Sequence, residues 1–146
     1  MPLSRKALCL IYAVVALIAF VGTWGNNLAY LDQGLLQANV RFWLDTLANP
    51  ASRSITIDIF FLGLAVFIWM LLEARRLGMR GVWWYLILGI GVAISVTVPV
   101  FLINRERVLA EREPSSSAGS LSRTDVVGLV SVTAAFLVYT GAALLV

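Results

Sequence analysis

The sequence predicts an all-α fold, an integral membrane four-helix bundle with a short amphipathic helix between helices 1 and 2. Hydrophobic residues make up 60% of the chain and charged residues 13%, whereas soluble domains average about 45–50% and about 25%. Four apolar stretches approach the ~20 residues that a helix needs to cross the hydrocarbon core, and they lack the alternation of barrel strands. They cover residues 7–24, 55–72, 82–103 and 126–146.

The first stretch, 7–24, follows Arg5 and Lys6 and contains no charge. It is longer than the roughly 7–15 apolar residues of a signal peptide and ends in a poor cleavage site. We therefore expect a membrane helix that is retained. Cys9 lies near its start without a lipoprotein signature, and we expect a buried thiol with no chemical role.

The connection 25–54 is predicted to contain the amphipathic helix. Apolar residues within 35–47 recur on one helical face, and this segment is too short to cross a membrane. We expect it to lie in the interface or over the mouth of the bundle, with Trp24 and Trp43 anchored at headgroup level. The apolar face comprises Leu36, Val40, Trp43, Leu44 and Leu47.

The second stretch contains Asp58, the only charged residue inside any of the four. An ionisable residue within a membrane is a functional candidate by default. Asp58, Asn26 and Asn27 are therefore candidates for binding a ligand or partner. In the alternative interpretation, Asp58 is a carboxylate near the membrane surface, stabilised by the dipole of a helix that starts either at Asn49 and Pro50 or at Ser54.

The turn after the second stretch contains Glu73, Arg75 and Arg76. These residues are candidates for docking a cytoplasmic partner. The alternative is that they anchor the helix at the interface and set the topology. Trp83 and Trp84 follow and are expected to be interfacial anchors.

Small residues recur on the third and fourth stretches at spacings that let another helix approach closely. The chain is expected to divide into a three-helix core over 1–113, a flexible linker over 114–123 and a fourth membrane helix over 124–146. Packing of the small residues within the bundle and packing against another protein both remain open. The positions are Gly91, Ser95, Pro99, Gly128, Ser131 and Ala135.

The orientation depends on the number of crossings. Four straight crossings put both termini on one side, with five Lys or Arg residues on that side and six on the other. The first helix usually sets the orientation. We therefore expect a bacterial inner membrane protein whose termini are both cytoplasmic.

Three segments occur together in a familiar order: IDIFF at 57–61, EARRLGMRGVW at 73–83 and SVTVPVFLINRE at 95–106. In this order they resemble a bacterial family of small membrane proteins of unknown function, domain of unknown function twenty-eight thirty-four. The resemblance covers roughly residues 7–110 and implies the fold. By analogy, the chain is also similar to an accessory subunit of mammalian-cell-entry-type lipid importers, the lipid uptake coordinator B kind.

The composition weighs against several function classes. The chain has no His and one Cys, so His-based catalysis and His or Cys metal sites are excluded. Asp58 and Glu73 are 15 residues apart, about 22 Å along a helix, which is too far for a paired-acid hydrolase. We expect no cofactor, no metal and no nucleic-acid partner.

Two functions remain open. The first is a non-catalytic accessory or stabilising subunit of a larger membrane complex, such as a lipid transporter. The alternative is a small carrier, or a lipid- or quinone-binding membrane protein, that uses Asp58 at the mouth of its bundle.

Overall fold

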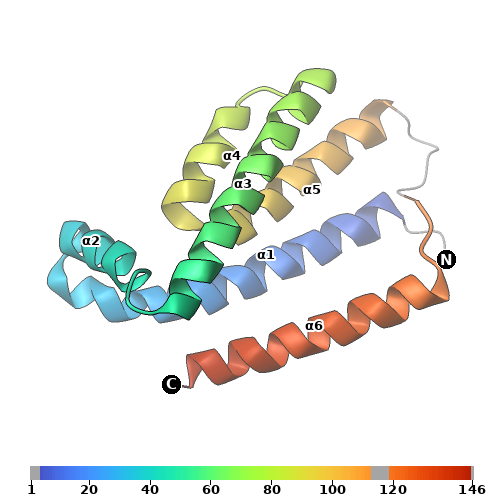
Figure 1. The fold of residues 1–146 in the computed structure, drawn as a ribbon. Coiled ribbons are helices and arrows are strands. Elements are labelled where there is room, and N and C mark those ends of the chain that lie inside the picture. Colours follow the sequence, from blue (N-terminus) through green and yellow to red (C-terminus); the bar gives the residue numbers. More distant parts are fainter. Residues whose placement is uncertain (1–3, 113–118, 146) are drawn as a thin grey trace.

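The computed structural model describes residues 4–112 and 119–145, and within them the fold is all-α (Figure 1). Four helical segments are long and apolar enough to cross a membrane, as the sequence predicts. The predicted amphipathic helix is present between the first two. The elements are α1 (Arg5–Asn27), the 3₁₀ segment η1 (Leu28–Gln33), α2 (Leu35–Asp45), α3 (Pro50–Arg76), α4 (Val82–Leu88), the π-helical segment η2 (Gly89–Ala93), α5 (Ile94–Arg112) and α6 (Arg123–Leu144).

Local sequence signals explain where these helices begin. Asn49 accepts a hydrogen bond from the Ser52 amide and Pro50 occupies the first turn, which confirms the predicted start of α3. Ser122 and Asp125 form the corresponding capping box for α6. Such caps satisfy backbone amides that have no partner inside the helix. Of the predicted linker 114–123, residues 114–118 lie outside the described part of the chain.

The third apolar stretch reverses direction instead of crossing straight. Tyr85 and Phe101 are 16 residues apart, about 24 Å along a straight helix, yet their ring centroids are 5.6 Å apart. A Cβ atom built on Gly89 would lie 3.0 Å from Thr97 Oγ1. The continuous helical segment Val82–Arg112 therefore folds into a hairpin, hereafter the α4–α5 hairpin, with η2 at its tip.

Two features make this reversal possible. The π-helical segment Gly89–Ala93 interrupts the regular hydrogen-bond ladder, and such interruptions are a recognised cause of helix bending. Gly89 has no side chain, so the Phe67 ring of α3 fits against it, with a ring atom 3.1 Å from where a Cβ would stand. The sequence predicts one crossing over 82–103 that Pro99 kinks near its end, whereas the chain turns at Gly89–Ala93, because apolar composition does not reveal a turn made within a helix.

Close contacts fix the direction of every long helix. α3 and α5 run parallel, since Gly63 meets Ile94 and Glu73 meets Arg105. α1 runs antiparallel to α5, because Arg5 pairs with Glu106 and the Cys9 thiol points to the Ile103 carbonyl. α6 runs parallel to α1: Gly22 is near Thr140 and Gly25 is near Leu144.

These directions define two ends of the bundle. The Arg5 end contains the start of α1, the ends of α3 and α5 and the start of α6. The α2 end contains α2, the start of α3 and the end of α6 (Figure 1). The start of α1 and the end of α6 lie at opposite ends, whereas four straight crossings would put them at the same end. The difference follows from the hairpin, which returns α5 to the Arg5 end.

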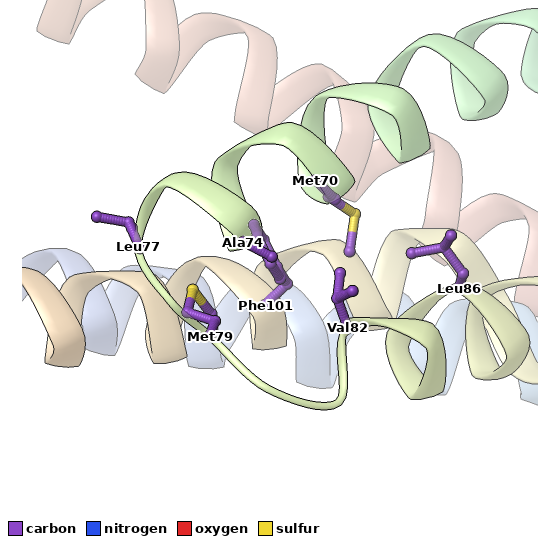
Figure 2. Packing of buried hydrophobic residues seen from close by; sticks show 7 residues of the cluster. All are labelled: Met70, Ala74, Leu77, Met79, Val82, Leu86 and Phe101. Atoms are coloured by element: carbon purple, nitrogen blue, oxygen red, sulfur yellow. The ribbon is translucent and has the colours of Figure 1, made fainter.

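An apolar cluster holds the hairpin against α3 (Figure 2). Phe101 of α5 and Met70 of α3 are fully buried in it. The rings of Trp69 and Tyr85 meet Phe101 edge-on. Lipid offers little hydrophobic driving force between helices, so this close packing is what stabilises the contact. The buried members are Met70, Ala74, Leu77, Met79, Val82, Leu86 and Phe101.

The amphipathic helix α2 packs beside the start of α3. Trp43 contacts Phe60 with ring centroids 5.8 Å apart, and Phe42 meets Tyr30 edge-on. The Tyr30 hydroxyl donates a hydrogen bond of 2.9 Å to Asp45. The remaining residues of the predicted apolar face are exposed, an arrangement suited to a helix in the membrane interface. They are Leu36, Val40, Leu44 and Leu47.

Candidate functional site

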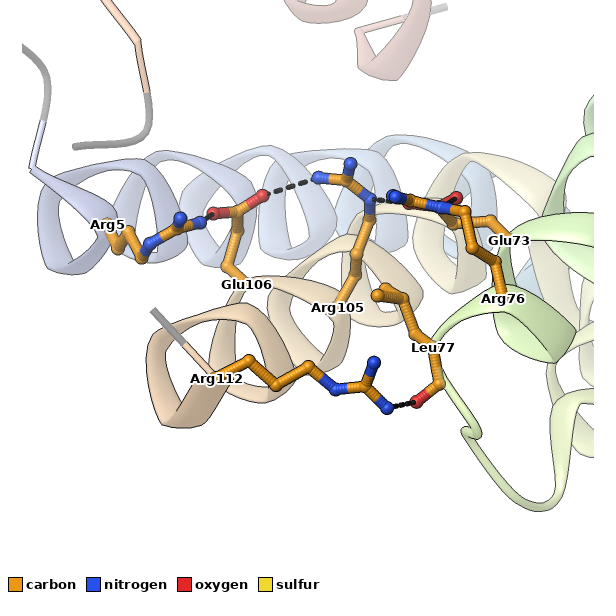
Figure 3. Close-up of polar contacts among 7 residues, drawn as sticks. All are labelled: Arg5, Glu73, Arg76, Leu77, Arg105, Glu106 and Arg112. Atoms are coloured by element: carbon orange, nitrogen blue, oxygen red, sulfur yellow. Dashed lines mark hydrogen bonds and ion pairs between the residues drawn. The ribbon is translucent and has the colours of Figure 1, made fainter. Parts of the chain in front are cut away.

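Five charged residues form a continuous chain of ion pairs at the Arg5 end (Figure 3). Arg5 Nη1 donates to Glu106 Oε2 at 2.7 Å, and Arg105 Nη1 donates to Glu106 Oε1 at 2.7 Å. Arg105 Nε donates to Glu73 Oε1 at 2.7 Å. Arg76 completes the chain with two hydrogen bonds to Glu73, of 2.6 and 2.7 Å. This set is hereafter the ion-pair chain.

Both carboxylates of the ion-pair chain are buried. The Glu73 and Glu106 side chains are 8% and 4% exposed. A buried charge is costly unless it is paired and hydrogen-bonded. Each carboxylate here lies between two guanidinium groups, and Arg76 grips Glu73 with the planar two-point geometry that strengthens such pairs. The ion-pair chain therefore satisfies the charges that it buries.

Three helices supply the ion-pair chain. Arg5 opens α1, Glu73 and Arg76 end α3, and Arg105 and Glu106 lie in the second half of α5. Neighbouring residues on a helix point about 100° apart. Arg105 can therefore face α3 while Glu106 faces α1. The five residues connect α1, α3 and α5 at one end of the bundle.

Arg112 adds a further contact between α5 and α3 (Figure 3). Its Nη2 donates to the Leu77 carbonyl at 2.9 Å. The last carbonyls of a helix have no partner within the helix, and Leu77 is the residue that follows the end of α3. Arg112 thus caps α3 from another helix and holds the end of α5 in place.

Of the residues predicted to dock a partner, Glu73 is buried inside the bundle, whereas Arg75 and Arg76 are exposed on its surface. Glu73 and Arg76 belong to the ion-pair chain, so Glu73 is engaged inside the bundle. The Arg76 side chain remains 62% exposed while it makes its pair. Arg75 is also exposed in the last turn of α3. Outward docking therefore stays a prediction for the two arginines.

Asp58, Asn26 and Asn27 are not brought together by hydrogen bonds. Asp58 is exposed on α3, and Asn26 donates to the Gly22 carbonyl of its own helix. Within the described residues, none of the hydrogen bonds joins Asp58 to either asparagine. A surface hollow of about 280 Å³ between α2 and α3 does not include Asp58 in its lining. That lining comprises Trp43, Thr46, Leu47, Arg53, Thr56, Ile57 and Phe60.

The predicted small-residue positions differ in their surroundings. Gly91 and Ser95 are exposed near the hairpin tip, whereas Pro99 is buried. On α6, all three predicted positions are exposed, and a Cβ on Gly128 would meet nothing within 4 Å. The α6 positions are Gly128, Ser131 and Ala135.

The predicted tryptophan anchors lie toward both ends of the bundle. Trp83 and Trp84 are exposed at the start of α4, at the Arg5 end. Trp43 of α2 and the half-buried Trp24 near the end of α1 lie toward the α2 end. Two levels of Trp are typical of membrane helices, whose interfacial rings sit at the headgroups.

Sequence reasoning missed three members of the ion-pair chain: Arg5, Arg105 and Glu106. Arg5 and Glu106 are 101 residues apart, and four straight crossings assign them to opposite sides of the membrane. Adjacent opposite charges at Arg105 and Glu106 after a long apolar run were the available signal. That signal gains meaning only once the chain is known to reverse at η2.

The acidic side chains are not arranged as a metal site. Among residues 4–112 and 119–145, no three His, Cys, Asp or Glu side chains are grouped so that they could hold a metal ion. Glu73 and Glu106 take guanidinium groups as their partners instead. The ion-pair chain therefore joins helices in this structure.

The fold and the ion-pair chain define a small all-α protein with four helices apolar enough to cross a membrane and a salt-bridged end. The chain belongs to the family described as Protein of unknown function DUF2834, whose model matches residues 11–107. The match runs from residue 11, within α1, to residue 107 of α5; it includes four of the five residues of the ion-pair chain and ends before α6. Curated proteins and solved structures gave no match.

Proposed function

We propose that this protein is a non-catalytic accessory or stabilising subunit of a larger complex in the bacterial inner membrane, with a lipid transporter as the first candidate complex. Its partner would be a transmembrane helix of a larger integral membrane protein. The likeness to lipid-importer accessory subunits motivates the candidate complex. The contact itself is argued from α6.

The observation that carries the proposal is the peripheral position of α6. None of its residues is buried, and it packs chiefly along α1. It lies outside the residues matched by the family, whereas the ion-pair chain and apolar cluster lie in or beside the matched region. A helix that adds little to its own bundle is available to pack against another protein.

The small residues of α6 support contact on its outer side. Thr140 and Leu144 face α1. At about 100° per residue, Gly128, Ser131 and Ala135 fall on the opposite side of the helix. Small residues allow two membrane helices to approach closely, which is how helices associate in lipid.

The test is recovery of the complex from native membranes. A tagged chain is extracted in mild detergent, and the proteins recovered with it are identified and quantified by mass spectrometry. Stoichiometric recovery of a larger transporter or enzyme complex is expected. Recovery of the chain alone, as a monomer or small homo-oligomer, contradicts the proposal.

Matched variants then test the face of α6. Replacing Gly128→Leu and Ser131→Leu together should remove the partner, because the larger side chains hold the helices apart. Val130→Leu is the control, since Val130 is exposed on the same helix and already carries a branched apolar side chain. Undiminished recovery with the double variant would exclude this face as the contact.

A further inference from the structure

The α4–α5 hairpin changes the distribution of charge between the two ends of the bundle. Straight crossings divide the Lys and Arg residues almost evenly. In the structure, the hairpin returns α5 to the Arg5 end, so nine of the eleven cations lie there and two lie at the α2 end. The nine are Arg5, Lys6, Arg75, Arg76, Arg80, Arg105, Arg107, Arg112 and Arg123, and the two are Arg41 and Arg53.

We propose that the α4–α5 hairpin is re-entrant: it enters and leaves the membrane at the cytoplasmic face, so the chain crosses three times and its C-terminus emerges on the opposite side from its N-terminus. The crossings are α1, α3 and α6. The Arg5 end then forms one basic surface against the anionic headgroups of the cytoplasmic leaflet.

The depth of the hairpin fits a re-entrant segment. Its tip, η2, lies beside the middle of α3, where Gly63 meets Ile94 and Phe67 meets Gly89. From Ile94 to Arg105 the helix rises about 16 Å, roughly half of the ~30 Å hydrocarbon core. The hairpin therefore reaches the middle of the membrane and returns to the interface where Arg105 joins the ion-pair chain.

The backbone of the hairpin is compatible with lipid. The segment Val82–Arg112 is helical throughout, including η2 at the turn. Chain reversal at membrane depth requires backbone groups to be satisfied within the protein. A turn made of helical backbone keeps hydrogen-bond partners close within the chain, and the Thr97 hydroxyl donates to the Ala93 carbonyl of η2 at 3.3 Å.

The charge asymmetry sets the orientation. Lys and Arg accumulate on the cytoplasmic side of membrane helices, counted near the ends of the crossings. The exposed cations at the Arg5 end include Lys6, Arg75, Arg80, Arg107 and Arg123. A cluster of four to eight such residues is typical of contact with an anionic leaflet. The Arg5 end is accordingly placed in the cytoplasm.

Single-cysteine labelling tests the proposal directly. Cys9→Ala gives a cysteine-free chain, and exposed sites near the two ends accept single cysteines. Arg80→Cys and Glu111→Cys report the Arg5 end, while Ala48→Cys and Leu145→Cys report the α2 end. Intact and permeabilised cells are treated with a membrane-impermeant maleimide.

Re-entrant topology predicts that the cysteines at positions 48 and 145 are labelled in intact cells, and that those at positions 80 and 111 are labelled only after permeabilisation. Labelling of position 111 together with position 48, with position 145 protected, means four straight crossings and overturns the proposal. Labelling of positions 80 and 111 in intact cells overturns the cytoplasmic placement.

Fusions to the unsubstituted chain give an independent readout. Alkaline phosphatase fused after residue 146 should be active, because that enzyme folds outside the cytoplasm, and a green fluorescent protein fused there should be dark. The reverse pair of results, with a fluorescent and enzymatically inactive C-terminus, contradicts the proposal even if a cysteine variant fails to fold.

Discussion

The two buried glutamates are the residues on which the Arg5 end depends. Glu73 binds Arg76 and Arg105, and Glu106 binds Arg5 and Arg105. Buried ion pairs contribute less to the free energy of folding than their number suggests, because the cost of removing the charges from water offsets their attraction. Removing one partner costs much more, since it leaves the other charge buried and unpaired. The ion-pair chain is therefore sensitive to single substitutions.

Glu73→Gln should destabilise the bundle by on the order of 3 kcal/mol, the range measured when one partner of a buried pair is lost. Arg105 then keeps Glu106 but loses its link to α3. The measurement is unfolding in detergent micelles titrated with sodium dodecyl sulfate, followed by circular dichroism. Glu111→Gln is the matched control, because Glu111 is an exposed carboxylate on α5. Equal stability of the two variants would contradict this role for Glu73.

A double-mutant cycle separates the energy of the contact between Glu73 and Arg105 from the effect of each residue alone. If Glu73 and Arg105 act through their 2.7 Å contact, Arg105→Met should cost less in the Glu73→Gln background than in the original chain. Contacting residues typically show coupling of about 0.5–3 kcal/mol. Strictly additive effects would mean that each residue acts through other neighbours.

At the scale of elements, two glycines in the hairpin tip have opposite surroundings. A Cβ on Gly89 would meet Thr97 and Phe67, whereas a Cβ on Gly91 would meet nothing within 4 Å. Both residues lie in η2. Substitutions at Gly89 and Gly91 therefore form a matched pair of variants that tests whether close packing at the tip holds the hairpin together.

Gly89→Leu should destabilise the protein by about 1–3 kcal/mol, the usual cost of overpacking, because the side chain separates α4 from α5 and α3. Gly91→Leu should be tolerated. The separation can be measured with spin labels on the exposed positions Ile87→Cys of α4 and Val100→Cys of α5 in a chain lacking Cys9. The distance should lengthen only in the Gly89 variant. A similar distance change in both variants would exclude specific packing at Gly89.

At the scale of the whole molecule, α6 contributes less to the stability of the bundle than the three helices that the ion-pair chain connects. The apolar cluster and the ion-pair chain lie in α1, α3, α4, α5 and the α3–α4 turn. α6 touches α1 through Thr140 and Leu144 at Gly22 and Gly25. The bundle without α6 should therefore be close to a complete fold.

Ending the chain after Arg112 should leave the midpoint of detergent unfolding nearly unchanged, because none of the removed α6 residues is buried. Ending it after Ala93 should prevent folding, since Phe101, Arg105 and Glu106 are then absent. Circular dichroism and tryptophan fluorescence measure both outcomes. A truncation at Arg112 that fails to fold would show that α6 stabilises the bundle through more than its contact with α1.

The sequence predicts the number and position of the apolar helices well, but it does not predict where the chain reverses direction. Length and hydropathy locate four apolar helices, and Asn49 with Pro50 marks the start of α3. The hairpin is invisible to those signals, because a straight helix and a helix reversed at Gly89–Ala93 have the same apolar content. A local cluster of charges marks Glu73 and Arg76 as candidates, but the pairing of Glu73 with Arg105 depends on the reversal of the chain.

The contact between Arg5 and Glu106 also has a consequence for biogenesis. These residues are 101 positions apart, so at synthesis rates of about 5–20 residues per second the ribosome needs roughly 5–20 s to produce the second after the first. α1 and α3 are complete before the hairpin begins at Val82. Arg5 lacks its α5 partner throughout that interval, whereas Glu73 lacks Arg105, which follows 32 positions later, for roughly 2–6 s. Once Arg105 and Glu106 have been synthesised, the ion pairs that connect α1, α3 and α5 can form.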